Sequence, residues 1–313
     1  MTATTPSTPD GEGTTLGVTD VLAIEDLRVH ELRALVDRAR SLKAGAAATS
    51  LEPGTTLGLL FEKPSTRTRV SFEVAMARLG GSTVYLGREE THLGRGEPVP
   101  DTGRVLGRYL DGIVARLFDH ADLVELAEHA ACPVINGLTD RAHPCQALAD
   151  LVTVEAHIGT PARLTWIGDA NNVARSFVAA ASMLGHDVIA ATPRAHAFEA
   201  DFVDRLQGFE GTLEVSDDPE VAVAGADVVY TDVWVSMGEE ADRDDKLAAF
   251  DGFQVNEALL SGTDARVMHC LPANRGEEVT DAVLTGDRSL VWDQAENRLH
   301  AQAALLEVLL GGD

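Results

Sequence analysis

Short apolar runs alternate with amphipathic stretches along the chain from about Asp26 onward. The stretches between the runs, such as residues 71–79 and 177–184, have helical spacing and end near glycines. The apolar runs have the length of buried strands. We expect strands at 56–61, 83–86, 112–115, 134–138, 164–167, 188–191, 213–215, 228–231, 267–271 and 290–292. This alternation predicts an α/β fold with parallel sheets that helices cover on both faces.

A domain boundary is predicted near residues 158–161, where glycine and proline interrupt the pattern. Before it, residues 145–157 indicate one long connecting helix, and after it Leu164 begins a new series of strands and helices. We expect two doubly wound parallel-sheet domains, at 19–150 and 151–294, after a disordered tail over residues 1–18. The last segment, 295–313, contains an apolar-faced helix that would pack back on the first domain.

The charge balance narrows the possible partners. Fifty acidic against twenty-five basic residues give a formal charge of −25. Nucleic acids and anionic membranes both need a cationic protein face, so we expect neither as a partner. Only three of the basic residues are lysines. An acidic, lysine-poor surface suits a protein kept soluble in concentrated salt, which predicts a halophilic source, although an ordinary acidic protein is the alternative.

The number of cysteines and the hydropathy of the chain indicate in which cellular compartment the protein works. Cys132, Cys145 and Cys270 are too few and too scattered for a disulfide framework or a CxxC metal site. No apolar run is long enough to span a membrane, and no secretory signal pattern opens the chain. We therefore expect a cytoplasmic protein, and nothing in the spacing implies a metal or an organic cofactor.

The run from Ser65 to Arg69 is the most informative stretch. A strand ends before it, Pro64 breaks the strand, and a helix begins among two hydroxyls and two arginines. Helix N-termini offer free backbone N–H groups and partial positive charge, and arginine binds phosphate oxygens in pairs. The alternative is that Ser65 or Thr66 only caps the helix. Two arginines beside the hydroxyls exceed what a cap needs, so we predict a phosphate site.

Five motifs in order give the chain a family resemblance. The run Ser65-Thr66-Arg67-Thr68-Arg69 resembles the carbamoyl-phosphate signature of the aspartate and ornithine carbamoyltransferases. The later segments are similar to that family's HPxQ motif, its Ser-Met-Gly loop of members that use ornithine, its HCLP motif and its closing helix. They are His143–Gln146, Asp232–Gly238, His269–Pro272 and Glu296–His300. The resemblance covers about residues 20–310.

The resemblance implies a carbamoyl-phosphate site in the first domain. Arg67 would lie at its centre, Arg116 would reach both phosphate and carbonyl oxygen, and His143 would donate to that oxygen. Gln146 would hold the carbamoyl nitrogen, and Arg298 would close the site. His92 stands where the family often has glutamine and would reach a neighbouring subunit's phosphate. The implied ligands are Ser65, Thr66, Arg67, Thr68, His92, Arg116, His143, Pro144, Cys145, Gln146 and Arg298.

The second domain would bind an amino acid. The resemblance implies ornithine contacts from Asn172, Asp232, Ser236, Met237, Cys270 and Leu271, with a structural role for Asn171. The catalytic set would be Arg67, Arg116, His143, Asp232 and Cys270. An attacking amine must first lose a proton, at about 4 kcal/mol if its pKa is that of lysine. Asp232 and Cys270 could relay that proton, or the departing phosphate could accept it. Cys270 could also be a small buried hydrophobe.

Several alternatives remain at this point. Within the family, aspartate as acceptor would need extra cations near Asp232 and Cys270, whereas residues 234–240 are acid-rich, so ornithine is preferred over aspartate, putrescine or a modified ornithine. A non-catalytic metabolite sensor on the same fold is a second reading. A dehydrogenase is disfavoured because residues 166–173 lack the glycine fingerprint of dinucleotide sites. The resemblance also implies a homotrimer or a multiple of trimers, without metal or cofactor.

Overall fold

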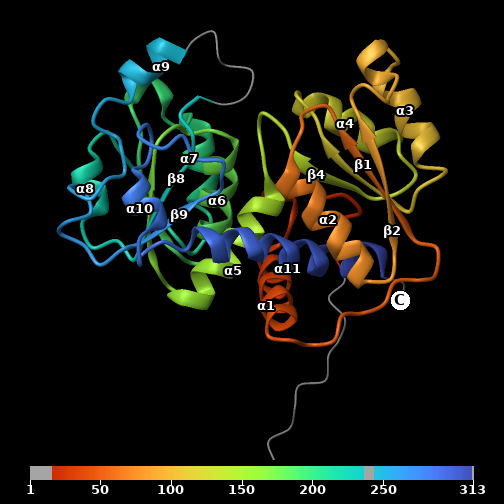
Figure 1. Ribbon diagram of the computed structural model, residues 1–313, viewed down its shortest axis with the longest axis horizontal. Coiled ribbons are helices and arrows are strands. Elements are labelled where there is room, and N and C mark those ends of the chain that lie inside the picture. Colours follow the sequence, from red (N-terminus) through yellow and green to blue (C-terminus); the bar gives the residue numbers. More distant parts are fainter. Residues whose placement is uncertain (1–15, 236–242, 312–313) are drawn as a thin grey trace, which may run out of the picture.

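The computed structural model describes residues 16–235 and 243–311. The first sheet has four parallel strands in the order β2-β1-β3-β4, and the second has five in the order β7-β6-β5-β8-β9. Figure 1 shows the two sheets side by side with helices around them. The predicted α/β class with two doubly wound parallel sheets is confirmed. The strands are β1 (Thr56–Phe61), β2 (Ser82–Gly87), β3 (Gly112–Arg116), β4 (Val134–Leu138), β5 (Arg163–Ile167), β6 (Asp187–Ala191), β7 (Leu213–Ser216), β8 (Val228–Thr231) and β9 (Arg266–His269).

Helices follow nearly every strand. Those that precede the second sheet are α1 (Val29–Lys43), α2 (Thr66–Arg78), α3 (Val99–Leu106), α4 (His120–His129) and α5 (Pro144–His157). Those that follow are α6 (Asn172–Met183), α7 (Ala200–Leu206), α8 (Pro219–Val223), α9 (Arg243–Ala249), α10 (Asp281–Thr285) and α11 (Val291–Leu310). Three short 3-10 turns complete the elements, η1 (Ile24–Asp26), η2 (Leu93–Arg95) and η3 (Arg194–His196). None of the described helices is long and apolar enough to cross a membrane.

Two largely buried helices, α5 and α11, lie between the two sheets (Figure 1). Nearly every residue of α5 is buried, and α11 packs against α5, α1 and α2 (Figure 1). The predicted border between residues 150 and 151 falls inside α5, which runs on to His157, and β5 begins at Arg163. We therefore propose that the two domains divide after α5.

One predicted strand is wrong. Residues 290–292 are the start of a helix, because α11 begins at Val291 and Leu290 stands directly before it. The preceding Ser289 forms an isolated bridge with Val267 of β9, and Leu290 and Val291 are both buried. Their burial produced the strand-like run. Similarly, β9 ends at His269 and not at Leu271, whose φ of 60° is incompatible with a strand.

The strand ends position the chemistry. Phe61 pairs with Arg116 at the carboxyl end of the first sheet, and Thr231 pairs with both Ile167 and His269 at the carboxyl end of the second. Ligands of open parallel sheets bind beyond the carboxyl ends of their strands. The motif residues that directly follow these strands therefore lie at the carboxyl edges of the two sheets.

Candidate active site

Hydroxyl groups and an arginine open α2 just beyond the end of β1. The Ser65 Oγ accepts from the backbone N–H of Thr68 (3.3 Å) and lies 3.0 Å from the Thr68 hydroxyl. Ser65 is therefore the helix cap that the alternative interpretation named, and it also fixes Thr68. Thr66 is exposed and Arg67 is half-buried in the first turn, where the helix N-terminus favours an anion.

Arg69 is engaged away from this end of the helix. Its Nε donates to Glu73 Oε1 (2.8 Å), and its guanidinium lies 3.8 Å from the centre of the Tyr85 ring. Of the two arginines in the run, Arg67 is the one whose charge acts on the buried groups described next.

Arg67, Arg116 and Arg298 form a cluster of positive charge. Arg116 ends β3, Arg298 lies on α11, and both side chains are almost fully buried. Burial is the main reason that the pKa of Arg116 falls to about 10, and the charges of Arg298 and Arg67 lower it further. Burial likewise lowers the pKa of Arg298. Arg116 Nε and Arg298 Nε are buried with no hydrogen-bond partner among the described residues. Such a cluster favours a bound anion.

His143 stands beside this cluster, directly before α5. Arg298 Nη1 lies 3.3 Å from His143 Nε2. A guanidinium can only donate, so Nε2 accepts and the ring hydrogen is on Nδ1. Burial first, and then the charges of Arg298, Arg116 and Arg67, hold the pKa of His143 well below its usual range. Nδ1 is buried and finds no partner in the described part of the chain. His143 is thus a neutral donor suited to a carbonyl oxygen.

Gln146 lies one turn along α5 and is also buried. Its Oε1 accepts from Arg298 Nη1 (2.5 Å), and its Nε2 donates to Asp150 Oδ1 (2.8 Å). Arg298 Nη2 donates to the Thr68 hydroxyl (3.1 Å). One guanidinium on α11 therefore joins the start of α2 to the start of α5.

The second group of site residues follows β8 and β9. The Cys270 Sγ donates to Asp232 Oδ1 (2.9 Å), and Asn171 Nδ2 donates to Asp232 Oδ2 (3.0 Å). Burial, reinforced by the Asp232 charge, raises the pKa of the Cys270 thiol well above its usual range. A chain of contacts joins this turn to the arginine cluster: the backbone N–H of His269 donates to Gln294, Gln294 and Gln146 both donate to Asp150, and Gln146 accepts from Arg298. The two groups form one site.

The turn after β9 is held in a strained conformation. Leu271 has a φ of 60°, a region that bulky side chains rarely adopt. Its backbone N–H donates to His269 Nδ1 (2.9 Å), so the other ring nitrogen carries the hydrogen and donates to Glu278 Oε1 (3.0 Å). This chain of bonds fixes the turn that carries Cys270.

Two of the predicted ligands have other partners. Asn172 Nδ2 donates to the backbone oxygen of Thr139 in a short bond, so its amide joins the two domains. Cys145 is buried, its thiol faces the backbone oxygen of Asn136 (3.5 Å), and burial raises its pKa to about 12. The Cys145 side chain therefore belongs to the core, and only its backbone, in the first turn of α5, is left to contact a ligand.

The remaining predicted residues are placed as follows. Pro144 is the buried first residue of α5. His92 is exposed before η2, and no described contact within this chain joins it to Arg67 or His143. Ser236 and Met237 lie outside the described residues.

Three buried polar residues behind the site were not predicted from the sequence. Asp150 accepts from Gln146, from Gln294 Nε2 (2.8 Å) and from the Tyr230 hydroxyl (3.0 Å). Burial raises the pKa of Asp150 to about 7, although these bonds and the charge of Arg298 lower it. Gln146 and Asp150 are four positions apart on a predicted helix, which could have signalled their contact. Tyr230 and Gln294 come from distant segments, and no local spacing connects them with Asp150.

One group among the described residues has donor atoms placed for a metal. Asp232, His269 and Cys270 each offer one atom within 4.8 Å of the others. Both His269 nitrogens, however, are already bonded to Leu271 and Glu278. These three side chains are better accounted for as a hydrogen-bonded support for the turn.

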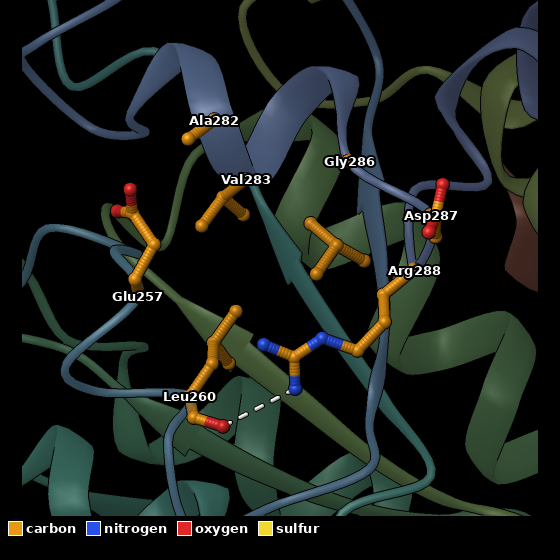
Figure 2. Close-up of a pocket in the computed structure, with 8 residues that line it drawn as sticks. Glu257, Leu260, Ala282, Val283, Gly286, Asp287 and Arg288 are labelled. Carbon is orange, nitrogen blue, oxygen red and sulfur yellow. Dashed lines mark hydrogen bonds between the residues drawn. The ribbon is translucent and has the colours of Figure 1, made fainter.

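A separate pocket of about 170 Å³ lies near the start of β9, the opposite end from Cys270. Figure 2 shows the Arg288 side chain reaching toward Leu260, whose backbone oxygen accepts from its guanidinium (3.2 Å). The same nitrogen also donates to the Thr263 oxygen (2.8 Å). Backbone oxygens therefore hold the Arg288 guanidinium. None of the residues that line this pocket belongs to the candidate active site.

Two family models match the chain. The carbamoyl-P binding domain of the aspartate/ornithine carbamoyltransferases matches residues 19–156, and their Asp/Orn binding domain matches residues 161–309. The ornithine carbamoyltransferase of Haloquadratum walsbyi is 55% identical over 92% of this chain and 97% of the relative. The enzyme named anabolic ornithine carbamoyltransferase in Pyrococcus furiosus is 47% identical over 94% and 96%.

Solved structures agree. The ornithine carbamoyltransferase from Pyrococcus furiosus superposes with a TM-score of 0.89 at 46% identity, covering 94% of this chain and 97% of its own. The one from Thermus thermophilus gives 0.86 at 42% identity, covering 94% and 99%. With both family models matched in order over the motifs that form the site, the chain belongs to the aspartate/ornithine carbamoyltransferase family.

Proposed function

We propose that this protein transfers the carbamoyl group of carbamoyl phosphate to the δ-amine of L-ornithine, giving L-citrulline and phosphate. The observation that carries the proposal is the position of the Cys270–Asp232 pair beside the cluster of Arg67, Arg116 and Arg298. One group suits a phosphate and the other an amine. Relatives that match over nearly the whole chain carry the name ornithine carbamoyltransferase.

The carbamoyl-phosphate half of the reaction needs an anion clamp and a donor for the carbonyl oxygen. In the proposed mechanism, Arg67 and the start of α2 bind the phosphate, with Ser65, Thr66 and Thr68 as further ligands. Arg116 and His143 Nδ1 donate to the carbonyl oxygen, where negative charge develops as the amine attacks. Donors that are fixed before the reaction need no reorganisation and stabilise the transition state most.

The amine half needs an uncharged nucleophile. The Cys270 thiol stays protonated because its pKa is raised, so no resident thiolate serves as a base. We propose that the ammonium passes its proton to the sulfur as the thiol passes its own to Asp232, which it already contacts at 2.9 Å. Asn171 holds the other Asp232 oxygen and orients the carboxylate for this transfer. Asn172, Leu271, Ser236 and Met237 would bind the rest of the amino acid.

Ornithine is favoured over aspartate by the charges near Cys270. A second substrate carboxylate would need a cation besides the three arginines that the proposal assigns to carbamoyl phosphate. Lys246, the lysine nearest along the chain to the Asp232 segment, donates to Asp169 Oδ2 (2.8 Å). The Asp232 carboxylate, which contacts the Cys270 thiol, suits a cationic acceptor instead.

The assembly and setting form part of the proposal. We propose a homotrimer or a multiple of trimers, with His92 reaching a neighbouring site. The exposed Val70 and Val74 of α2 and Val84 of β2 supply an apolar face near the phosphate site that would suit a second copy of the chain. The three free cysteines fit a reducing cytoplasm, and the charge of −25 fits a halophilic cytoplasm.

An acceptor comparison tests the function. Purified protein in molar salt is given carbamoyl phosphate with ornithine, aspartate or putrescine, and the carbamoylated product is measured. We expect citrulline from ornithine and at least about a hundredfold less product from the other two, because a site built for one polar pattern leaves groups unpaired with another. Equal or greater product from aspartate or putrescine would contradict the acceptor assignment.

A further inference from the structure

A buried carboxylate stands directly behind Gln146. Asp150 lies one turn further along α5 and is fully buried. Its Oδ1 accepts from both Gln146 Nε2 and Gln294 Nε2 at 2.8 Å, and its Oδ2 accepts from the Tyr230 hydroxyl at 3.0 Å. At a pH above its raised pKa of about 7, the Asp150 carboxylate is ionised and only accepts, so it satisfies three donors at once.

These bonds determine which end of the Gln146 amide faces the site. Nε2 is held on Asp150, and Oε1 accepts from Arg298 Nη1 at 2.5 Å. If the amide turned over, its NH2 group would meet the Arg298 donors and its oxygen would meet the Asp150 carboxylate. A donor would then face a donor at Arg298, and an acceptor would face an acceptor at Asp150, and both unpaired contacts would be buried. Asp150 and Arg298 together therefore allow one orientation.

The same carboxylate is anchored to the ornithine side of the site. Tyr230 is two positions before Asp232 on β8. Gln294 Oε1 accepts from the backbone N–H of His269 (2.9 Å), the residue before Cys270. Asp150 is thus fixed by α5, by α11 and by β8, and its position behind Gln146 does not depend on a single flexible contact.

We propose that Asp150 is a positioning residue that keeps the Gln146 amide oxygen toward the substrate, so that the site selects a carbamoyl group over an acyl group without N–H donors. The inference rests on the proposed function. An amide oxygen has two lone pairs, so Oε1 can accept from a carbamoyl NH2 group as well as from Arg298. The methyl group of acetyl phosphate has no hydrogen to donate and leaves that lone pair unpaired.

The test compares carbamoyl and acetyl phosphate in the same protein. The KM for carbamoyl phosphate and the Ki of acetyl phosphate as its competitor are measured at saturating ornithine in molar salt. Asp150→Leu removes both carboxylate oxygens, so Gln146 Nε2 loses its acceptor and the Gln146 amide is released. We expect the ratio of acetyl phosphate Ki to carbamoyl phosphate KM to fall about tenfold, the usual effect of losing one buried hydrogen bond.

Thr153→Val is the matched control. The Thr153 hydroxyl accepts from Asn297 Nδ2 (2.8 Å) across the same α5–α11 interface without touching Gln146. We expect it to leave the ratio unchanged. If the ratio fell equally in Thr153→Val, or if both constants weakened in parallel in Asp150→Leu, Asp150 would serve the packing alone and the proposal would fail.

Two further proteins complete the design. In a Gln146→Ala background, Asp150→Leu should not lower the ratio again, because Asp150 acts through Gln146. Asp150→Ser, which leaves room for water, is the second variant, and failure of both Asp150 variants to fold would assign the residue to the fold and overturn the inference. Absence of citrulline from the wild type would reject the proposed function itself. Normal turnover with an unchanged ratio in Asp150→Leu would reject only the role of Asp150.

Discussion

The Cys270 thiol donates its hydrogen to the Asp232 carboxylate across 2.9 Å and so joins the ends of two adjacent parallel strands. The raised pKa of the thiol means that its sulfur meets an approaching ammonium with the hydrogen already directed at an acceptor. The pair can therefore move a proton from amine to carboxylate without a free thiolate.

Replacing Cys270 by serine tests this arrangement. The hydroxyl of Cys270→Ser is shorter and reaches Asp232 poorly, so we expect the KM for ornithine to rise about tenfold or more, on the scale of one buried polar contact. Cys132→Ser, a cysteine of the first domain outside the site, is the control and should leave that KM unchanged. Steady-state kinetics with ornithine varied decides the matter, and unaltered constants in Cys270→Ser would assign the thiol to core packing.

Arg67 should be more important for turnover than its neighbour Arg69. We expect Arg67→Ala to lower kcat/KM for carbamoyl phosphate by about 3 kcal/mol of transition-state stabilisation, roughly two orders of magnitude. Arg69→Ala should have a small effect, because Arg69 is engaged with Glu73 and Tyr85. Wild-type kinetics in Arg67→Ala, or equal losses in both variants, would refute the assignment.

Arg298 acts through the geometry of its fork. Arg298→Lys keeps the charge but cannot reach Thr68 and Gln146 together. We expect the KM for carbamoyl phosphate to rise about tenfold. Arg38→Lys, which disturbs a bidentate pair with Glu307 on the same helix, should lower thermal stability and spare the KM. A normal KM in Arg298→Lys would mean that charge alone is sufficient.

The neutral state of His143 predicts a pH dependence of stability. Because the folded pKa lies well below the ordinary value of 6.5, the unfolded chain binds a proton that the folded one does not as pH falls below 6.5. The free energy of unfolding should therefore decrease toward acid pH, by up to about 1.4 kcal/mol per pH unit from this residue.

His143→Asn should have a shallower slope between pH 7 and 5 than the wild type. Urea unfolding at constant high salt measures both. Asp150, whose pKa is raised to about 7, contributes a slope of opposite sign, but it is present in both proteins and its effect cancels in the difference. Parallel slopes would show that His143 is not held neutral in the folded state.

Much of the fold could be predicted because buried parallel strands are local apolar runs. The exception at residues 290–292 arose because a helix start buried on one side has the same composition as a strand. The start of α2 and its cap at Ser65 follow from local chemistry and were predictable. The motif residues of the site could be named through the family resemblance, but their bonds to one another could not.

The support behind the site depends on segments far apart in the sequence. Asp150 contacts Tyr230 and Gln294 only because α5, β8 and α11 pack together. The engagement of the Cys145 thiol with Asn136 was equally hidden, because a buried thiol and a ligand-facing one have the same sequence context. The Asp150 contacts could be seen only once the second sheet was placed, and the Cys145 contact only once α5 was placed on β4 of the first sheet.

The most direct test of the central claim is a product balance with carbamoyl phosphate and ornithine in molar salt, for wild type and Arg67→Ala side by side. The account predicts citrulline and phosphate in equal amounts from the wild type, and a rate lower by about two orders of magnitude from the variant. Phosphate released without citrulline, or citrulline formed equally fast by both proteins, would contradict it.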